Sequence, residues 1–217
     1  RQVVWVGKGK GRKTIDYFFN EVMSAGQRKR VQTACCDMSR TYIGAIEDHL
    51  PEALLVIDRF HVIKELNNAV DETRKEVWRT ASKAERKGLK GLRFILLKNR
   101  KNRTRREHKI MAEITRTQRQ VARACELKDE LAHFWTYSYI GSAEKKRAKL
   151  SRIEPLKKFA RTLENHWEGV MASMTGITNA VAEGLNRVIR MTKNRASGYR
   201  STDNFANMIY LIIGDLD

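Results

Sequence analysis

The sequence has little proline, little cysteine and no long apolar run. Its 217 residues include two prolines and three cysteines. No stretch approaches the roughly 20 consecutive apolar residues that span a bilayer, which argues against a transmembrane protein. The cysteines, at positions 35, 36 and 125, are odd in number and lack metal-site spacing, so we expect a reducing compartment and no disulfide framework. The scarcity of proline is consistent with a helix-dominated second half.

Acidic residues are also in short supply. Asp and Glu total 25 against 43 Lys and Arg, which gives a formal net charge of +18 and a pI of about 10.1. This imbalance predicts a polyanionic partner, most readily nucleic acid, with an acidic membrane surface as the competing interpretation. Hydrophobic residues nevertheless make up 41% of the chain, so a substantial core can form.

Strand and helix patterns alternate in the first third of the chain. Residues 2–6, 31–36 and 54–57 are short β-like runs, and residues 15–23 and 39–50 carry apolar side chains at helical spacing. The resulting β-α-β-α-β order favours an α/β sheet with at least one parallel pair of strands.

Strand patterns vanish after His61. Helical periodicity dominates the rest of the chain, interrupted by a basic segment at residues 98–106 that we predict to be a loop. Trp135, Tyr137 and Tyr139 form an aromatic cluster, which would more readily pack within this helical block than stack on unpaired bases.

These patterns predict three regions. The first, residues 1–62, is a partial α/β portion. The second, residues 63–176, is a helical insertion. The third, residues 177–217, consists of C-terminal helices, with Thr178 or Asn179 as the N-cap of the first one.

Two carboxylates lie where chemistry could use them. Asp37 follows a strand-like run, and ligands bind at the carboxyl ends of strands in α/β sheets, although capping the next helix is a common role for Asp. Glu183 lies on an amphipathic helix near Arg187 and Arg190, which is either a ligand-binding stripe or a solvent face stabilised by Glu–Arg pairs. Carboxylates among positive charge are what a two-metal phosphoryl-transfer site on DNA requires.

Three segments carry a resemblance to a known family. They are CCDMSRTY at residues 35–42, LLVIDRFHVIKELNNAVDETR at residues 54–74 and NAVAEGLNRVIRMTKNRASGYR at residues 179–200. With similarity running through most of the chain, they resemble the catalytic domain of DDE transposases of bacterial insertion sequences, specifically the ISL-three family. The resemblance implies an α/β fold: a partial ribonuclease-H-like sheet with a large all-helical insertion before the final carboxylate helix. It also implies that the C-terminal helices return to the α/β core.

The same resemblance implies roles for individual residues. Asp37 and Glu183 match two of the three catalytic carboxylates and would bind metal. Asp58 and His61 match a supporting Asp-x-x-His pair, with metal binding by Asp58 itself as the alternative. The residues expected to contact DNA are Arg59, Lys64, Arg100, Lys101, Arg103, Arg187, Arg190 and Lys193.

The implied activity is DNA transposition by metal-dependent strand cleavage and transfer, with two Mg²⁺ (or Mn²⁺) ions in the complete protein. A strand ending in the first catalytic aspartate has no match in this sequence, so we expect a fragment with incomplete chemistry. The alternative is a catalytically incomplete, transposase-derived DNA-binding protein without enzymatic activity. Expected partners are DNA, at the element ends and at the target, and a second copy of the chain in a homodimer, without a membrane. The expected location is the bacterial cytoplasm, at the nucleoid.

Overall fold

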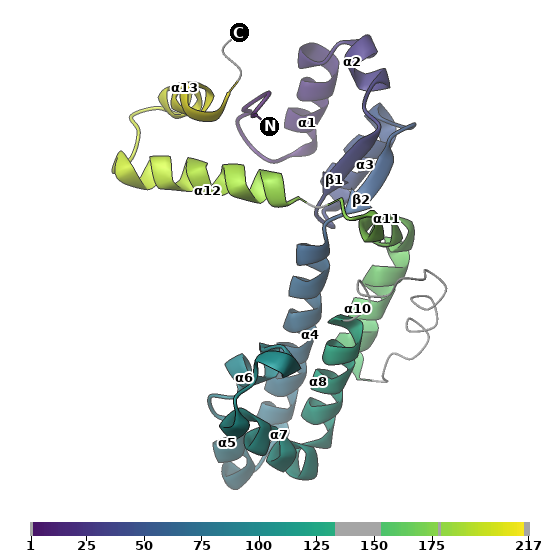
Figure 1. Cartoon of the computed structure of the whole chain (residues 1–217), viewed down its shortest axis with the longest axis vertical. Helices are drawn as coiled ribbons and strands as arrows, with labels where there is room; N and C mark the ends of the chain where they lie inside the picture. Colours follow the sequence, from purple (N-terminus) through teal and green to yellow (C-terminus); the bar gives the residue numbers. More distant parts are fainter. Residues whose placement is uncertain (1, 133–152, 178, 215–217) are drawn as a thin grey trace. The chain divides into compact units, whose positions relative to one another are not determined.

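The computed structural model describes residues 2–132, 153–177 and 179–214, and most of these residues are helical (Figure 1). The chain divides into two compact units. One combines Arg1–Asp58 with Glu168–Asp217, and the other is Arg59–Trp167. Among the described residues, no helix has the combination of length and apolar character that a membrane span requires.

The first unit contains a small parallel sheet. Strand β1 (Thr33–Cys36) pairs with strand β2 (Leu54–Ile57) so that Cys36 lies opposite Ile57. Helix α3 (Arg40–His49) connects the two strands, as a parallel pair requires. The strands predicted at residues 31–36 and 54–57 and their parallel pairing are therefore confirmed.

Two short helices precede the sheet. Helix α1 (Arg12–Tyr17) continues into a π-helical turn, η1 (Phe18–Val22), and helix α2 (Ala25–Lys29) follows. Ser24 and Gln27 form a capping box at the start of α2, which satisfies two backbone N–H groups that the helix itself leaves free.

Residues 2–6 do not join the sheet, and the prediction of a strand there is wrong. Val3 instead forms an isolated parallel bridge with Gly214, and the Val6 N–H donates to the Tyr210 hydroxyl at 2.8 Å. The β-like pattern of this segment therefore reflects an extended backbone packed against the C-terminal helix.

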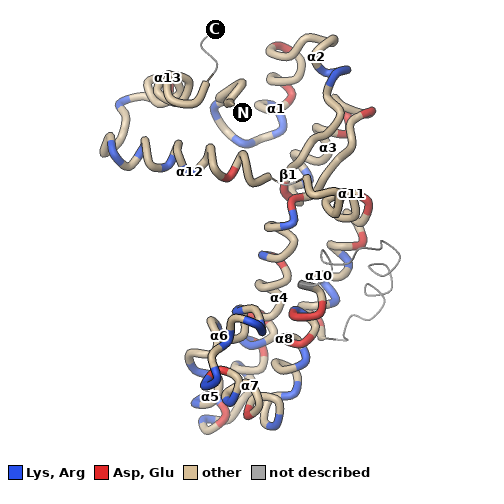
Figure 2. The backbone as a smooth tube through the Cα atoms, viewed as in Figure 1, with Lys and Arg blue, Asp and Glu red and all other residues tan. Residues whose placement is uncertain are grey.

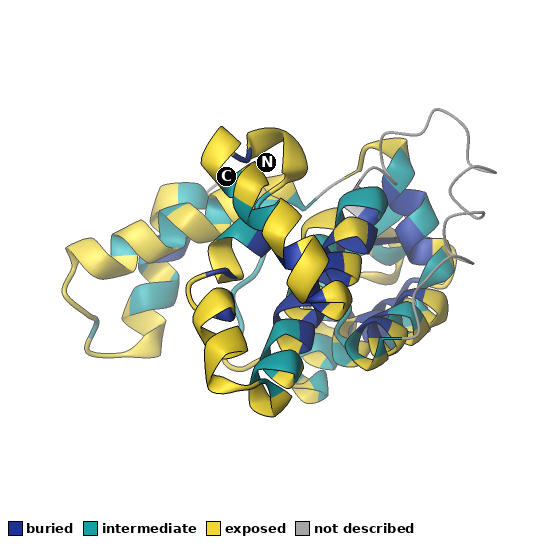
Figure 3. Ribbon diagram, turned by 90° about the horizontal axis from the view of Figure 1, so that it is seen from below, coloured by how far each residue is buried: buried dark blue, intermediate teal, exposed yellow. Residues whose placement is uncertain are grey.

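The C-terminal part of the first unit is helical. Its elements are α11 (Trp167–Ala172), η4 (Ser173–Thr175), α12 (Ala180–Arg195) and α13 (Thr202–Ile213). Gly169 lets α11 approach β2 closely, because a Cβ atom at this position would lie 2.7 Å from Ile57 Cγ1. Helix α12 contributes no buried residue, in contrast to the packed helices whose inner faces are dark blue in Figure 3.

Every element of the second unit is a helix in the part that the structure describes. They are α4 (Arg59–Thr80), α5 (Lys83–Leu89), α6 (Arg93–Leu97), η2 (Arg100–Asn102), α7 (Arg105–Thr117), α8 (Arg119–Ala132) and α10 (Glu154–Asn165). Helix α4 packs against α8 and α10, and the core comprises Val62, Leu66, Val70, Val121, Leu127 and Leu156. The aromatic cluster at Trp135, Tyr137 and Tyr139 lies outside the described residues.

Candidate metal and DNA-binding site

Two aspartates share one edge of the sheet. The Asp58 N–H donates to the Cys36 carbonyl at 2.8 Å, so the backbone ladder of the two strands extends to Asp58. Asp37 is the residue directly after Cys36. Both aspartates therefore follow the last paired residues of adjacent parallel strands, at the carboxyl edge where α/β sheets bind ligands.

The two carboxylates differ in exposure. Asp58 is only 2% exposed, whereas Asp37 is half-buried. Asp37 Oδ1 accepts a hydrogen bond from the Ser39 N–H at 3.0 Å, which orders the turn before α3. The N-cap residue of α3 is Ser39, so the competing prediction, that Asp37 caps this helix, is wrong. The Asp37 hydrogen bond orders the turn just before the helix instead. Among the described residues, Asp37 Oδ2 has no hydrogen-bond partner.

The two adjacent free cysteines of β1 have pKa values that are raised in part by the negative charge at this edge. Burial, followed by the charge of Asp58, raises the pKa of the Cys35 thiol to about 11. Burial, followed by the charge of Asp37, raises the pKa of the Cys36 thiol to about 12. Each thiol is therefore protonated at neutral pH, which suits a small packing residue better than a nucleophile or a soft-metal ligand.

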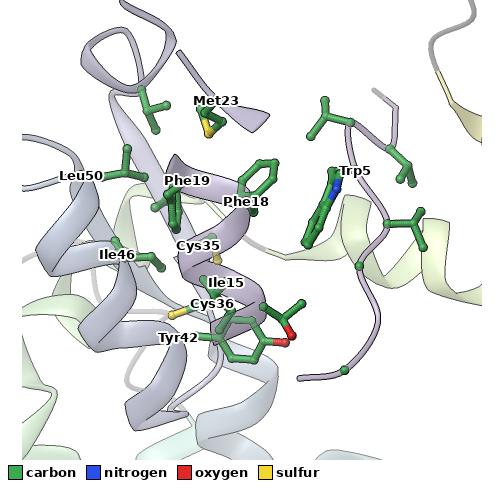
Figure 4. A pocket seen from close by; sticks show the side chains of 18 of the residues that line it. Trp5, Ile15, Phe18, Phe19, Met23, Cys35, Cys36, Tyr42, Ile46 and Leu50 are labelled. Atoms are coloured by element: carbon green, nitrogen blue, oxygen red, sulfur yellow. The ribbon is translucent and has the colours of Figure 1, made fainter. Parts of the chain in front are cut away.

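An apolar cavity of about 730 Å³ connects the end of β1 with α12. Cys35 and Cys36 line it from the strand, and Asn186 and Ile189 line it from the helix. Figure 4 shows the aromatic and aliphatic side chains that form its walls, with Trp5 facing Phe18. The ring centroids of that pair are 5.3 Å apart. Because no charged side chain lines the cavity, it is a packing feature beside the carboxylate edge and not a metal site itself.

Glu183 lies on α12, three residues before Asn186, and is exposed. The cations Arg187, Arg190 and Lys193 follow it along the same helix and are also exposed. Figure 2 shows the single acidic segment of α12 followed by basic ones. Among the described residues, Glu183 makes no ion pair, so the predicted Glu–Arg stabilisation of a solvent face is not what this helix shows.

The supporting residues of the second unit lie at the start of α4. Arg59 and Lys64 are exposed, and His61 is half-buried. The His61 ring meets the Phe60 ring edge-on, with 5.5 Å between the centroids. The first two turns of α4 therefore present cations to solvent and keep the histidine against an aromatic ring.

The basic segment at residues 98–106 separates into two kinds of residue. Arg100 and Lys101 lie on the short helix η2 and are exposed, as a DNA contact requires. Arg103, which we expected to contact DNA, is buried and forms an ion pair with Asp129. Its guanidinium is engaged inside the second unit, so we remove it from the set of proposed DNA contacts.

Sequence reasoning also missed a buried cation on α8. Lys128 is buried beside Asp129. The spacing could have revealed it, because Lys128 follows Ala124 by four residues and Val121 by seven, on the apolar stripe of the helix.

Comparison with known proteins identifies the family. The profile of ISL3-type DDE transposases, described simply as "Transposase", matches residues 1–209. The chain belongs to this ISL3 (ISL-three) family. The family predicted from the three sequence segments is thereby confirmed.

Two curated relatives illustrate the similarity. The transposase for insertion sequence element IS1001 of Bordetella parapertussis is 31% identical over 215 residues, which cover 94% of this chain and 53% of the relative. The transposase for insertion sequence element IS1557 of Mycobacterium tuberculosis is 25% identical over 231 residues, which cover 92% of this chain and 51% of the relative. The chain thus spans about half the length of the curated relatives it matches. No solved structure matches it significantly.

The carboxylate oxygens of this ISL3-family chain are the type of ligand that a hard divalent cation prefers. Mg²⁺ and Mn²⁺ prefer carboxylate oxygen ligands, and Asp37 offers an oxygen without a hydrogen-bond partner in the described part of the chain. The number of ligands is incomplete, because no group of three His, Cys, Asp or Glu side chains gathers within the described residues. A complete site would therefore need ligands beyond the carboxylates that this chain offers.

Proposed function

We propose that this chain supplies two carboxylates and a DNA-binding surface to a transposase that cleaves and transfers DNA strands. In this proposal the sheet is part of a ribonuclease-H-like core. The observation that carries it is the carboxylate edge of the sheet, where Asp37 and Asp58 follow adjacent strands in the same compact unit as α12. Family membership supports the same conclusion.

Each residue has a distinct role in the proposed site. Asp37 and Glu183 hold a divalent ion, Mg²⁺ or Mn²⁺. A bound ion there would supply Lewis-acid polarisation of the scissile phosphate. Asp58, which is nearly inaccessible to solvent, stabilises the carboxyl edge of the sheet, and His61 is a second supporting residue. These roles make Asp37 more important for metal binding than Asp58.

The cations on α12 bind the DNA backbone in this proposal. Arg187, Arg190 and Lys193 follow Glu183 on an exposed helix, and Arg59 and Lys64 offer further positive charge on α4. Cations that meet phosphates bind DNA with little preference for sequence, since the backbone carries no base information. The partner is therefore duplex DNA at the bacterial nucleoid, and two copies of the chain would act on it together.

Calorimetric titration with Mn²⁺ tests the metal assignment in this chain. Asp37→Asn and Glu183→Gln should each remove most of the binding heat, and Asp58→Asn should retain a measurable part of it. Loss of binding in Asp58→Asn with retention in Asp37→Asn would transfer the metal-ligand role to Asp58.

A chimaera with a full-length relative tests strand cleavage. The 217 residues would replace the matching half of the IS1001 transposase, and plasmid nicking would be measured with Mn²⁺. Nicking that disappears with Asp37→Asn supports the proposal. A chimaera that binds DNA and never nicks it would favour the alternative, a DNA-binding protein without enzymatic activity.

A further inference from the structure

The corner between α6 and α7 concentrates positive charge on the second unit. Residues 98–109 contain seven Lys or Arg and one Glu. Figure 2 shows this corner as a cluster of blue segments. Five of its cations are exposed and have no carboxylate within ion-pair distance in the part of the chain that the structure describes: Arg100, Lys101, Arg105, Arg106 and Lys109.

Arg103 anchors this corner from the inside. Its side chain is 4% exposed and forms an ion pair with Asp129 at 3.1 Å. The same guanidinium donates from Nε to the Ile95 carbonyl at 3.2 Å and from a terminal nitrogen to the Lys98 carbonyl at 3.0 Å. One planar fork therefore joins the end of α6, the following loop and α8.

Lys128 provides a second internal anchor. Its side chain is 3% exposed, and Nζ donates to the Leu96 carbonyl at 2.8 Å and to the Lys98 carbonyl at 2.9 Å. The last carbonyls of a helix have no partner within the helix and attract cations. Two buried cations thus occupy the carbonyl end of α6, and Asp129 lies between them as their shared carboxylate.

The far side of the corner is fixed at the start of α7. The Thr104 and Glu107 side chains form a capping box, and Lys98 forms an ion pair with Glu107 at 2.9 Å. The segment between Lys98 and Thr104 is therefore held at both ends. A surface whose shape is fixed before binding avoids the entropic cost of ordering its side chains and backbone on the ligand.

We propose that the α6–α7 corner is a preformed binding surface for DNA phosphates, separate from α12. Arg100, Lys101, Arg105 and Arg106 are its contact residues, and Arg103 and Lys128 are positioning residues. This inference rests on the proposed function, because it takes DNA as the partner. An acidic membrane surface is the rival partner, and the test below includes it.

The test measures binding of the chain to a labelled 20-base-pair duplex of mixed sequence by fluorescence anisotropy between 50 and 200 mM salt. Arg100→Ala/Lys101→Ala is compared with Lys158→Ala/Arg161→Ala, which removes the same charge from exposed positions on α10. The logarithm of the binding constant falls linearly with the logarithm of the salt concentration, and each phosphate contact makes this decrease steeper by about 0.9. The magnitude of this slope should therefore be smaller by about 2 in the corner variant, which should also bind DNA several-fold more weakly than the control variant.

Arg103→Lys isolates the positioning role because it keeps the charge and removes the fork. It should speed amide hydrogen exchange at residues 98–104 and weaken DNA binding several-fold without changing the salt slope. An unchanged exchange rate and affinity would overturn that role. If this variant does not fold, Arg100→Ala/Lys101→Ala still decides the surface, since both side chains are exposed.

The possible failures can be told apart. Equal slopes for the corner variant and the α10 control would overturn the surface while leaving the proposed function intact, provided that Arg187→Ala/Arg190→Ala weakens DNA binding. Absence of DNA binding in the unmodified chain, together with pelleting on phosphatidylserine vesicles, would overturn the inference and the DNA partner of the proposed function.

Discussion

Asp37 and Asp58 occupy matching positions, each one residue beyond the last paired residue of its strand. This relationship predicts paired effects on the neighbouring thiols. Asp58→Asn removes a charge that raises the pKa of Cys35, so the Cys35 thiolate fraction and its alkylation rate should increase. Asp37→Asn should act in the same way on Cys36.

The measurement is iodoacetamide alkylation at pH 9, resolved by residue with peptide mass spectrometry. Cys125 is the internal control, because it belongs to the second unit and its alkylation rate should be the same in both variants. Equal acceleration of Cys35 and Cys36 in either variant would contradict the pairing of each aspartate with its own cysteine.

Gly169→Ala should destabilise the first unit. The new methyl group would lie 2.7 Å from Ile57 Cγ1, so α11 must move away from β2, at a cost of about 1–3 kcal/mol. Gly184→Ala on α12 is the matched control. Apart from the backbone of α12 itself, none of the described residues has an atom within 4 Å of its new Cβ, and alanine should stabilise the helix by about 0.5–1 kcal/mol. Urea unfolding followed by circular dichroism would reveal opposite signs, and a neutral Gly169→Ala would rule out the close packing.

The first unit should lose stability in acid through Asp16. Hydrogen bonds from His49 and Arg12 lower the pKa of the Asp16 carboxyl below its ordinary value of 3.8. The unfolded state therefore takes up the proton first. The stabilisation is fully present above pH 3.8 and is lost as the pH falls through the folded-state pKa.

Asp16→Asn checks this prediction, because it removes the titrating group. Thermal unfolding between pH 2.5 and 6 should show a smaller decrease in Tm below pH 4 in the variant than in the unmodified chain. A parallel decrease in both proteins would show that other carboxylates dominate the acid sensitivity.

Lys128→Ala should destabilise the second unit by about 3 kcal/mol, because it removes a buried cation from the Leu96 and Lys98 carbonyls and leaves Asp129 with Arg103 alone among the described cations. Lys109→Ala removes the same charge from an exposed position and should change the free energy of unfolding by less than about 0.5 kcal/mol. Denaturant unfolding of the two variants gives the comparison. Similar stability in both would mean that Lys128 is solvated in solution.

Local patterns predicted the elements that carry the site. The runs at residues 31–36 and 54–57 combine apolar residues with flanking polar ones, and the structure contains β1 and β2 there. Residues 2–6 have a similar pattern but pair with Gly214 instead of the sheet. The alternation of apolar and polar residues alone cannot distinguish a sheet strand from an extended segment beside a helix, because both place alternate side chains against a core.

It was harder to predict from the sequence which charged side chains are buried and which are exposed. Arg103 and Arg100 look equivalent in a basic run, yet only Arg103 finds Asp129, which lies far along the chain on α8. Burial of a cation depends on such a long-range partner, so it follows from tertiary structure and not from the local sequence. Lys128 is the exception, since its place on an apolar stripe was visible in the sequence.

The first unit is assembled from two stretches of chain with the whole second unit between them. The hydrogen bond from Val6 to Tyr210 joins residues 204 positions apart. During translation, the contiguous second unit can fold as soon as it leaves the ribosome, whereas the first unit must wait for its closing helices. Glu183 is thus made long after Asp37, so a ribosome that stalls after residue 167 would yield a folded helical unit attached to a first unit that lacks α11, α12 and α13.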